Sequence, residues 1–320
     1  MIVSRVFRRI DLNRILFLTD FTEPSDQAIP YVASFARGFE SEILTAHVIT
    51  DVRAGSSDTS ESLARAQWAE RVAADGMARV HSQLSGLNHE SLTLHRGSVW
   101  EGVRELVEER NIDLIVAGSH RRTWADGLMH DSIAEEIFRR ASVPVLVIGP
   151  HTFPTSHNAG AFRRILFATD FSAESQAATP FAVSLAEQND AKLFVLHVLP
   201  KRKTQEVPPS EAATAAHVMH SFYETMPADV ELWCRPEVTL RFGDPAPEIL
   251  EAAADLRADL VVLGVRRACC GKCAHAKLPG ITIARTIVAG ARCPVLAVRQ
   301  PETRRQIFRV NSLLNTEHRV

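Results

Sequence analysis

An internal repeat constrains this 320-residue chain more than any other feature. The segment RILFLTDF, which begins at Arg14, returns as RILFATDF at Arg164, with seven of eight residues identical. Gly118 and Gly264 continue the correspondence, although the spacing between the copies falls there from 150 to 146 residues. Because repeat architectures appear as self-similarity at a fixed period, these ordered matches predict two copies of one domain.

The repeat also sets the expected domain boundaries. We predict one domain at residues 1–150 (copy one), a second at 160–300 (copy two) and a C-terminal tail at 301–320. Each copy has the length of a domain that buries its own hydrophobic core, which is about 100–200 residues.

Within each copy, short apolar runs alternate with stretches of helical periodicity. The strands expected in copy one are 15–18, 42–48, 91–95, 114–117 and 145–148, and those in copy two are 165–168, 193–198, 237–241, 260–263 and 295–298. The expected helices include 25–39, 62–84, 99–109 and 133–140. Apolar strands separated by helices predict an α/β fold of two doubly wound domains, each a parallel five-stranded sheet with helices on both faces. Such sheets bind ligands at the carboxyl ends of their strands, near the topological switch point.

Composition and charge exclude several classes of protein. The formal net charge is −2 and no long basic run occurs, so nucleic acid is not an expected partner. No apolar stretch reaches the roughly 18–20 residues that span a bilayer, and the first residues lack the apolar core of a secretory signal. The five cysteines are odd in number and all follow residue 233, which argues against a disulfide framework. We therefore expect a cytoplasmic protein without a membrane partner.

Three common phosphate and nucleophile motifs are absent from the sequence. No G-x-G-x-x-G follows a strand, and no G-x-S-x-G occurs. The pair Gly271-Lys272 is followed by Cys273 and lacks the upstream glycine of a P-loop. These absences remove the commonest dehydrogenase, hydrolase and NTPase interpretations.

A carboxylate follows the first strand of both copies, at Asp20 and Asp170. It could accept hydrogen bonds from a ligand, or it could belong to a helix cap together with Ser25 or Ser175. The fourth strand of copy one ends in Gly118-Ser119-His120, where a glycine allows a phosphate close to the backbone or simply permits a turn. His47 and His197 stand at strand ends, which indicates a shared packing or hydrogen-bonding role.

Together these residues resemble the universal stress protein family, present here in tandem. The resemblance rests on the openings ILFLTDFTEPSDQAI and ILFATDFSAESQAAT, on IDLIVAGSH and ADLVVLGVR, and on the closings SVPVLVI and RCPVLAV, so it covers nearly the whole chain. Nucleotide-binding members carry G-x2-G-x9-G-[ST] after the fourth strand. The resemblance implies ATP or another adenine nucleotide as ligand. By position, the adenosine contacts would be Asp20 and Val48 in copy one, and Asp170 and Val198 in copy two.

The glycine loop of copy one departs from the family pattern. Gly118 keeps the first glycine, but Arg121 and Asp131 replace the second and third, and Ser132 keeps the hydroxyl. Side chains at these positions crowd a phosphate, and the carboxylate adds like charge. The arginine guanidinium offers donors in compensation, and His120 keeps its native spacing. We expect weakened nucleotide binding, with copy one the stronger site.

The corresponding loop of copy two departs further. Gly264 keeps the first glycine, Arg267 takes the place of the second, Ile281 aligns with the third, and Thr282 holds the hydroxyl position. Arg266 is a second guanidinium that could contact phosphate or simply be solvated. The sequence places no general base beside a phosphate, so we expect at most a slow intrinsic ATPase.

The enlarged loop of copy two carries the donor types of a zinc site in Cys269, Cys270, Cys273 and His275. The spacing lacks the paired C-x2-C of structural zinc sites. A thiol sensor, with Lys272 favouring thiolate, is an alternative, and a variable loop with neither role is favoured over both. Cys293, at the start of the last strand, is expected to be shielded.

The sequence thus predicts a non-catalytic stress-response regulator. The family dimerises through its last strand, which implies an intramolecular pseudo-dimer joined at residues 143–148 and 293–298; a further homodimer is left open. One alternative is a nucleotide-free module that binds an unknown protein partner, and another is a metal- or redox-responsive regulator that uses residues 269–275.

Overall fold

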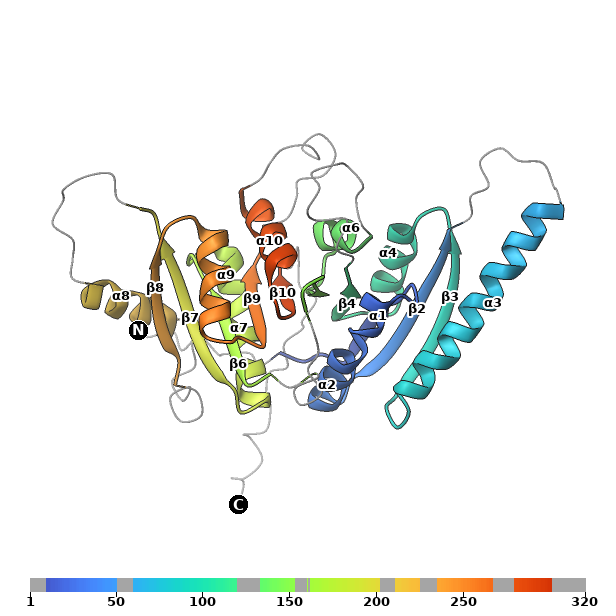
Figure 1. Cartoon of the computed structure of the whole chain (residues 1–320). Helices are drawn as coiled ribbons and strands as arrows, with labels where there is room; N and C mark the ends of the chain where they lie inside the picture. The colour runs from blue at the N-terminus through green and yellow to red at the C-terminus, as the bar shows by residue number, and fades with distance from the viewer. Residues whose placement is uncertain are drawn as a thin grey trace, which may run out of the picture.

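One continuous mixed sheet runs through the whole molecule (Figure 1). The computed structural model describes residues 10–50, 60–119, 133–152, 160, 162–201, 211–224, 235–266 and 279–300. Its strands lie in the order β3-β2-β1-β4-β5-β10-β9-β6-β7-β8. They are β1 (Arg14–Leu18), β2 (Glu42–Thr50), β3 (His89–Arg96), β4 (Leu114–Gly118), β5 (Val145–Ile148), β6 (Arg164–Ala168), β7 (Lys192–Leu199), β8 (Glu237–Phe242), β9 (Leu260–Gly264) and β10 (Val295–Val298).

Each half of this sheet is a doubly wound five-stranded unit. All neighbouring strands within a half pair in parallel, and β1 and β6 lie at the centre of their halves. The predicted α/β fold of two repeated parallel sheets is therefore confirmed.

Two layers of helices cover the sheet. They are α1 (Glu23–Asp26), α2 (Ile29–Phe39), α3 (Ser60–Gln83), α4 (Val99–Glu109), α6 (Ile133–Arg140), α7 (Ala173–Gln188), α8 (Glu211–Tyr223), α9 (Pro245–Asp255) and α10 (Pro279–Gly290). Side chains of α2, α3, α7 and α8 pack into the core on one face with Phe17, and those of α4, α6, α9 and α10 pack on the other with Leu16. Successive strand residues point to opposite faces, which is why the apolar strands fill both cores.

The helix expected at 25–39 is interrupted in copy one. Helix α1 ends at Asp26 and α2 begins at Ile29, and between them the Ala28 N–H donates to Ser25 O at 3.0 Å in a tighter turn. Pro30 has no N–H to continue the regular pattern. Copy two carries Pro180 at the equivalent position, and α7 nevertheless runs through it as one helix.

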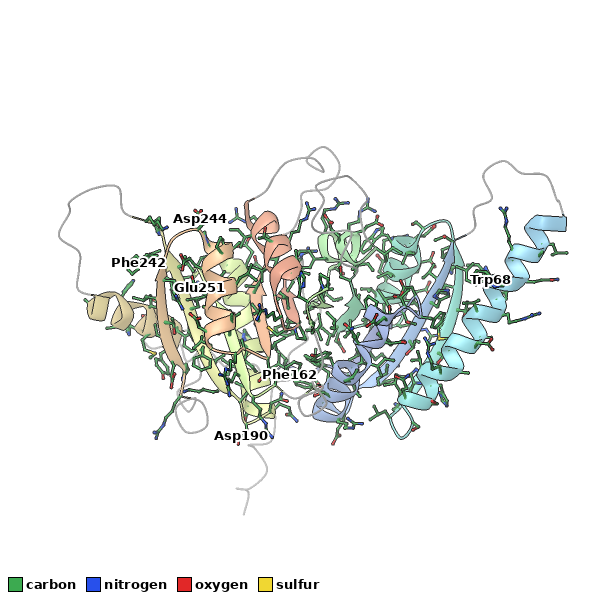
Figure 2. The ribbon with its side chains drawn as sticks, in the orientation of Figure 1. Trp68, Phe162, Asp190, Phe242, Asp244 and Glu251 are labelled. Carbon is green, nitrogen blue, oxygen red and sulfur yellow. The ribbon has the colours of Figure 1, made fainter. Side chains whose placement is uncertain are left out.

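The two halves join through their last strands. Strands β5 and β10 pair antiparallel with Leu146 opposite Leu296, which confirms the predicted contact between the final strands. Phe162, at the entrance to copy two, packs its ring on Tyr31 and Phe35 of α2 with centroid distances of 6.0 and 5.4 Å, in the middle of the molecule (Figure 2). The junction is thus part of the core on both faces of the sheet.

Cys293 lies at this junction and is 6% exposed, as expected for a shielded thiol. Burial, with a smaller effect of the Asp259 carboxylate, raises the pKa of Cys293 to about 12. Within the described ranges, no helix combines the length and apolar character needed to cross a bilayer. The predicted tail at 301–320 lies outside the described residues.

Candidate functional site

A cavity of about 300 Å³ opens at the carboxyl ends of β1, β2 and β4 in copy one. This is the switch point of the half-sheet, because β1 lies between β2 and β4. Ligand pockets usually have volumes of about 300–1,000 Å³, so this one matches the lower end of the range. Its walls are formed by Leu18, Thr19, Asp20, Ser25, Ala46, His47, Val48, Val99, Ala117, Gly118, Ser119, Ile133, Ala134 and Ile137.

Asp20 stands at the mouth of the cavity, held by the start of α1. Its Oδ1 accepts hydrogen bonds from the backbone N–H of Thr22 at 3.1 Å, from Thr22 Oγ1 at 2.5 Å and from Ser25 Oγ at 2.6 Å. Thr22 is the N-cap residue of α1, and its own side chain makes no capping bond. The carboxylate therefore orders the turn before the helix, and it also lines the cavity.

Phe21 follows in a left-handed conformation, with φ of 61°. Bulky residues seldom adopt this region, so the surrounding contacts must hold it there. Its ring lies 4.5 Å from the His47 ring, between centroids, and its carbonyl accepts a hydrogen bond from Arg79 of α3. Copy two repeats the conformation at Phe171, with φ of 60°.

Val48 places backbone groups at the cavity. The N–H of Thr19 donates to Ala46 O at 3.1 Å, so the backbone groups of Ala46 face β1. The backbone N–H and C=O of Val48, two residues further along β2, also point toward the β1 side. They lie beyond Leu18, the last residue of β1. They lie where the resemblance places an adenosine contact.

His47 lies beside Val48 in the cavity wall. Its Nδ1–H donates to Thr19 O at 2.8 Å, and His197 repeats the bond to Thr169 O at 2.8 Å. The expected hydrogen-bonding role of this pair is confirmed. In the neutral ring, this bond leaves Nε2 as the acceptor.

Gly118 ends β4 against the start of α1. A Cβ built on it would lie 2.2 Å from Pro24 O, and one on Gly264 would lie 2.3 Å from Ser175 N and 2.4 Å from Glu174 O. Real Cβ atoms do not come so close to backbone, so both glycines are required by strand–helix packing, with or without a phosphate.

Copy two builds the same turn with the same backbone bond to the carboxylate but with a different helix cap. Asp170 Oδ1 accepts from Ser172 N at 3.0 Å, and Ser172 rather than Ser175 is the N-cap of α7. Partial burial acts to raise the pKa of Asp170, but hydrogen bonds from Ser172 and Ser175 outweigh it, so that pKa is lowered. Val198 stands in β7 as Val48 does in β2, because the N–H of Thr169 donates to Leu196 O, two residues earlier.

The residues that follow β9 in copy two differ from those that follow β4 in copy one. Buried Ser119 is replaced by buried Val265, which removes a hydroxyl. Arg266 Nε donates to Glu174 Oε1 at 3.2 Å, in an ion pair that reaches from the end of β9 to the first turn of α7. The predicted phosphate role of Arg266 would therefore compete with this carboxylate.

Several predicted site residues lie outside the described residues, namely His120, Arg121, Ser132, Cys269, Cys270, Cys273 and His275. Thr282 falls in α10, but its side chain is not among those described. Across the described ranges, no three His, Cys, Asp or Glu side chains gather as a metal site would require. The structure brings Asp20, Val48 and Gly118 together around one cavity.

Sequence reasoning missed the apolar wall of the cavity. Val99 comes from the start of α4, and Ile133 and Ile137 come from α6. Their helical periodicity indicated only core positions. For Val99 the available signal was that α4 begins just after the carboxyl end of β3 at Arg96, at the edge of the sheet where ligands bind.

The fold and the site define a tandem doubly wound α/β protein with a ligand-sized cavity at the switch point of its first half. The family model for the universal stress protein family matches residues 12–149 and 161–299. The chain belongs to the universal stress protein family.

Known relatives agree with this assignment. Universal stress protein MJ0531 of Methanocaldococcus jannaschii is 26% identical over 153 residues, which are 44% of this chain and 84% of the relative. A universal stress protein structure from Archaeoglobus fulgidus aligns with a TM-score of 0.69 at 18% identity, covering 92% of this chain and 98% of that one. A functionally unknown protein from Pseudomonas aeruginosa, PA1789, aligns at 0.55 and 15% identity, covering 91% and 94%. These structural likenesses concern the fold.

Proposed function

We propose that copy one binds an adenine nucleotide and that the protein acts in the cytoplasm as a non-catalytic regulator in the stress response. The observation that carries this proposal is the cavity in which Asp20, Val48 and Gly118 meet. The family resemblance assigns ligand contacts to these three positions, and the fold gathers them from the ends of three different strands.

The lining suits a nucleoside in its distribution of polar and apolar groups. Val48, Val99 and Ile137 offer apolar surface for a base, and backbone groups of Val48 lie beside it. Asp20 stands at the mouth with its Oδ1 fixed by Thr22 and Ser25, where a carboxylate accepts hydrogen bonds from ribose hydroxyls. A cavity that is already formed, with its carboxylate held in place, binds a ligand with less ordering cost.

Copy two is the weaker site in this proposal. Val265 removes the hydroxyl that Ser119 provides, and Glu174 adds a carboxylate beside the region where phosphates would lie. Negative charge at that position repels a polyphosphate, even though Arg266 offsets part of it.

Calorimetric titration with ATP, ADP, AMP and adenosine tests the proposal, with Asp20→Ala and Asp170→Ala as matched variants. Because a hydrogen bond to a charged group contributes about 1.5–3 kcal/mol, Asp20→Ala should weaken binding at least about tenfold. Asp170→Ala should leave the main binding event unchanged. Equal losses in both variants, or a loss only with Asp170→Ala, would contradict the assignment to copy one.

Native mass spectrometry of the purified chain separates this proposal from its alternatives. A bound adenine nucleotide supports it, and bound zinc would favour the metal-responsive alternative at residues 269–275. Absence of both, together with no calorimetric binding, would replace it by the nucleotide-free interaction module. Phosphate release from ATP at several turnovers per minute would contradict the non-catalytic role.

A further inference from the structure

The two halves are related by a pseudo-two-fold axis at the β5·β10 pair. Leu146 and Leu296 face each other there, and they are equivalent residues, 150 positions apart. A residue on a two-fold axis meets its own counterpart, and away from the axis each contact occurs twice, so a true homodimer needs a surface that is complementary to itself. The side chains beside this axis are complementary instead of identical.

Glu135 of α6 and Arg285 of α10 are the first such pair. They are counterparts at a spacing of 150, and Arg285 Nη2 lies 2.8 Å from Glu135 Oε1. The two helices meet in the middle of the molecule (Figure 1). The Glu135 side chain is only 4% exposed, and a buried carboxylate is costly without an opposite charge.

Arg299 and Gly149 are a second unlike pair of counterparts. Arg299 is 5% exposed, and its guanidinium donates to Ala141 O at 2.8 Å and to Phe138 O, at the carboxyl end of α6. Cations are favourable at that end of a helix. Gly149 faces the equivalent carbonyl of α10, that of Val288, and a Cβ on Gly149 would lie 2.5 Å from Val288 O. On one side of the axis an arginine binds the end of the helix. At the equivalent position on the other side there is no room for a side chain.

We propose that this interface is a partner-selecting surface, on which copy one accepts copy two and rejects a second copy one. Two copy-one halves would bury Glu135 against Glu135 and leave both α6 termini without a guanidinium. Two copy-two halves would bring Arg285 against Arg285 and place Arg299 where the backbone fits only glycine. The surface therefore pairs unlike copies of the domain and does not support like-with-like pairing with a second copy of this chain.

The test uses the full chain with a protease site inserted in segment 153–159 and cut after folding. Heavy-isotope wild type is mixed with light protein carrying Glu135→Arg and Arg285→Glu. The urea concentration is the one at which cut heavy and cut light wild-type proteins exchange their halves at random. The urea is then removed so that the halves pair again. Native mass spectrometry counts every pairing.

We expect the charge-reversed chain to retain its own 1:1 pairing of unlike halves. Crossed pairs join a wild-type half to a reversed half, so they place two carboxylates or two guanidinium groups together at the axis. The measured fraction of crossed pairs should be at least about tenfold lower than random mixing would give, because like charges at an interface suppress wrong partners. Reversal of Arg14 and Glu42, a 2.9 Å pair inside copy one, is the matched control and should mix at random. Random mixing of the Glu135/Arg285 variant would overturn the proposal.

A second variant covers the case in which charge reversal prevents folding. Glu135→Gln with Arg285→Gln keeps the approximate shape and removes both charges. It should raise the fraction of like-with-like halves at least about tenfold above that of nicked wild type. An unchanged fraction, or like-with-like pairs already at the random level in wild type, would refute charge selection at the axis.

Discussion

Copies one and two share the residues that shape the backbone and the ligand contacts proposed above, and they differ beside the cavity and at the junction of the halves. Asp113 accepts hydrogen bonds from two backbone N–H groups, of Asn13 and Arg14, and its counterpart Asp259 does the same for residues 163 and 164, with distances between 2.8 and 3.0 Å. Gly118 and Gly264 also repeat, as do the bonds of His47 and His197. The strongest sequence matches therefore mark supports of the fold.

Two of the differences lie at the cavity mouth and at the pseudo-two-fold axis. Ser119 becomes Val265 at the mouth, and Glu135 faces Arg285 at the axis. At these two places the fold does not require the same side chain in both copies. The ligand contacts proposed for copy one, Asp20 and Val48, are themselves matched in copy two by Asp170 and Val198.

The largest expected effect tests whether the repeated glycines are architectural. Gly118→Ala and Gly264→Ala should each lower the free energy of unfolding by about 3 kcal/mol, because the new Cβ overlaps backbone at the start of α1 or α7. Urea denaturation of both variants measures this.

Gly97→Ala serves as the control, since the nearest atom to its Cβ would be Glu101 Oε2, a flexible side-chain end at 3.3 Å. It should change the free energy of unfolding by less than about 1 kcal/mol, because Ala can adopt the backbone conformation at this position. If Gly118→Ala left the free energy of unfolding unchanged, the glycine would be needed only for a ligand. The two copies would then differ in architecture as well.

A smaller effect concerns the turn of copy two at low pH. The pKa of Asp170 is lowered in the folded state, so its carboxylate contributes stability above the unfolded pKa of about 3.9, and this contribution is lost as pH falls through the lower folded value. Because the residue is exposed, Asp170→Asn should cost only about 0.5 kcal/mol at pH 7. The difference from wild type should shrink as pH falls below this unfolded value.

Unfolding by urea at pH 7 and at acid pH checks this expectation. Asp75→Asn, on the exposed surface of α3, is the control and should alter stability little at either pH. A difference between Asp170→Asn and wild type that grows as pH falls would reverse the sign of the argument.

The smallest effect is expected at the junction of the halves. Val143 is the counterpart of Cys293, and both are 6% exposed. Cys293→Val should therefore change the free energy of unfolding by less than about 1 kcal/mol, and the native thiol, with its pKa raised to about 12, should resist alkylation.

Cys293→Ser is the contrasting variant, because a buried hydroxyl without a partner costs about 1–3 kcal/mol. Peptide mapping after timed alkylation would detect exposure of this site. Rapid labelling of Cys293 in the folded chain would show that the junction opens, which would weaken the description of the two halves as one core.

Much of the fold was available from the sequence. Strands and helices leave patterns among residues that are neighbours in the chain, so periodicity located the strands. The repeat, together with the family resemblance, predicted the joining of residues 143–148 and 293–298. The interruption between α1 and α2 was not predicted, because Pro30 and Pro180 carry the same local signal and only their surroundings separate them.

The candidate site was only partly accessible in this way. The family resemblance pointed to Asp20, Val48 and Gly118, and topology brought them to one cavity. Its apolar wall from α4 and α6 looked like ordinary core, because periodicity does not distinguish a buried face from a pocket wall.

By itself, the sequence determined that this protein is a tandem α/β chain of the universal stress protein family, because the repeat and the motifs can be recognised from the order of the residues alone. Only the tertiary structure decided that Gly118 is required by the Pro24 backbone and that Glu135 meets Arg285. Those partners are distant in the chain, and only the sheet register and the crossing of helices bring them within bonding distance.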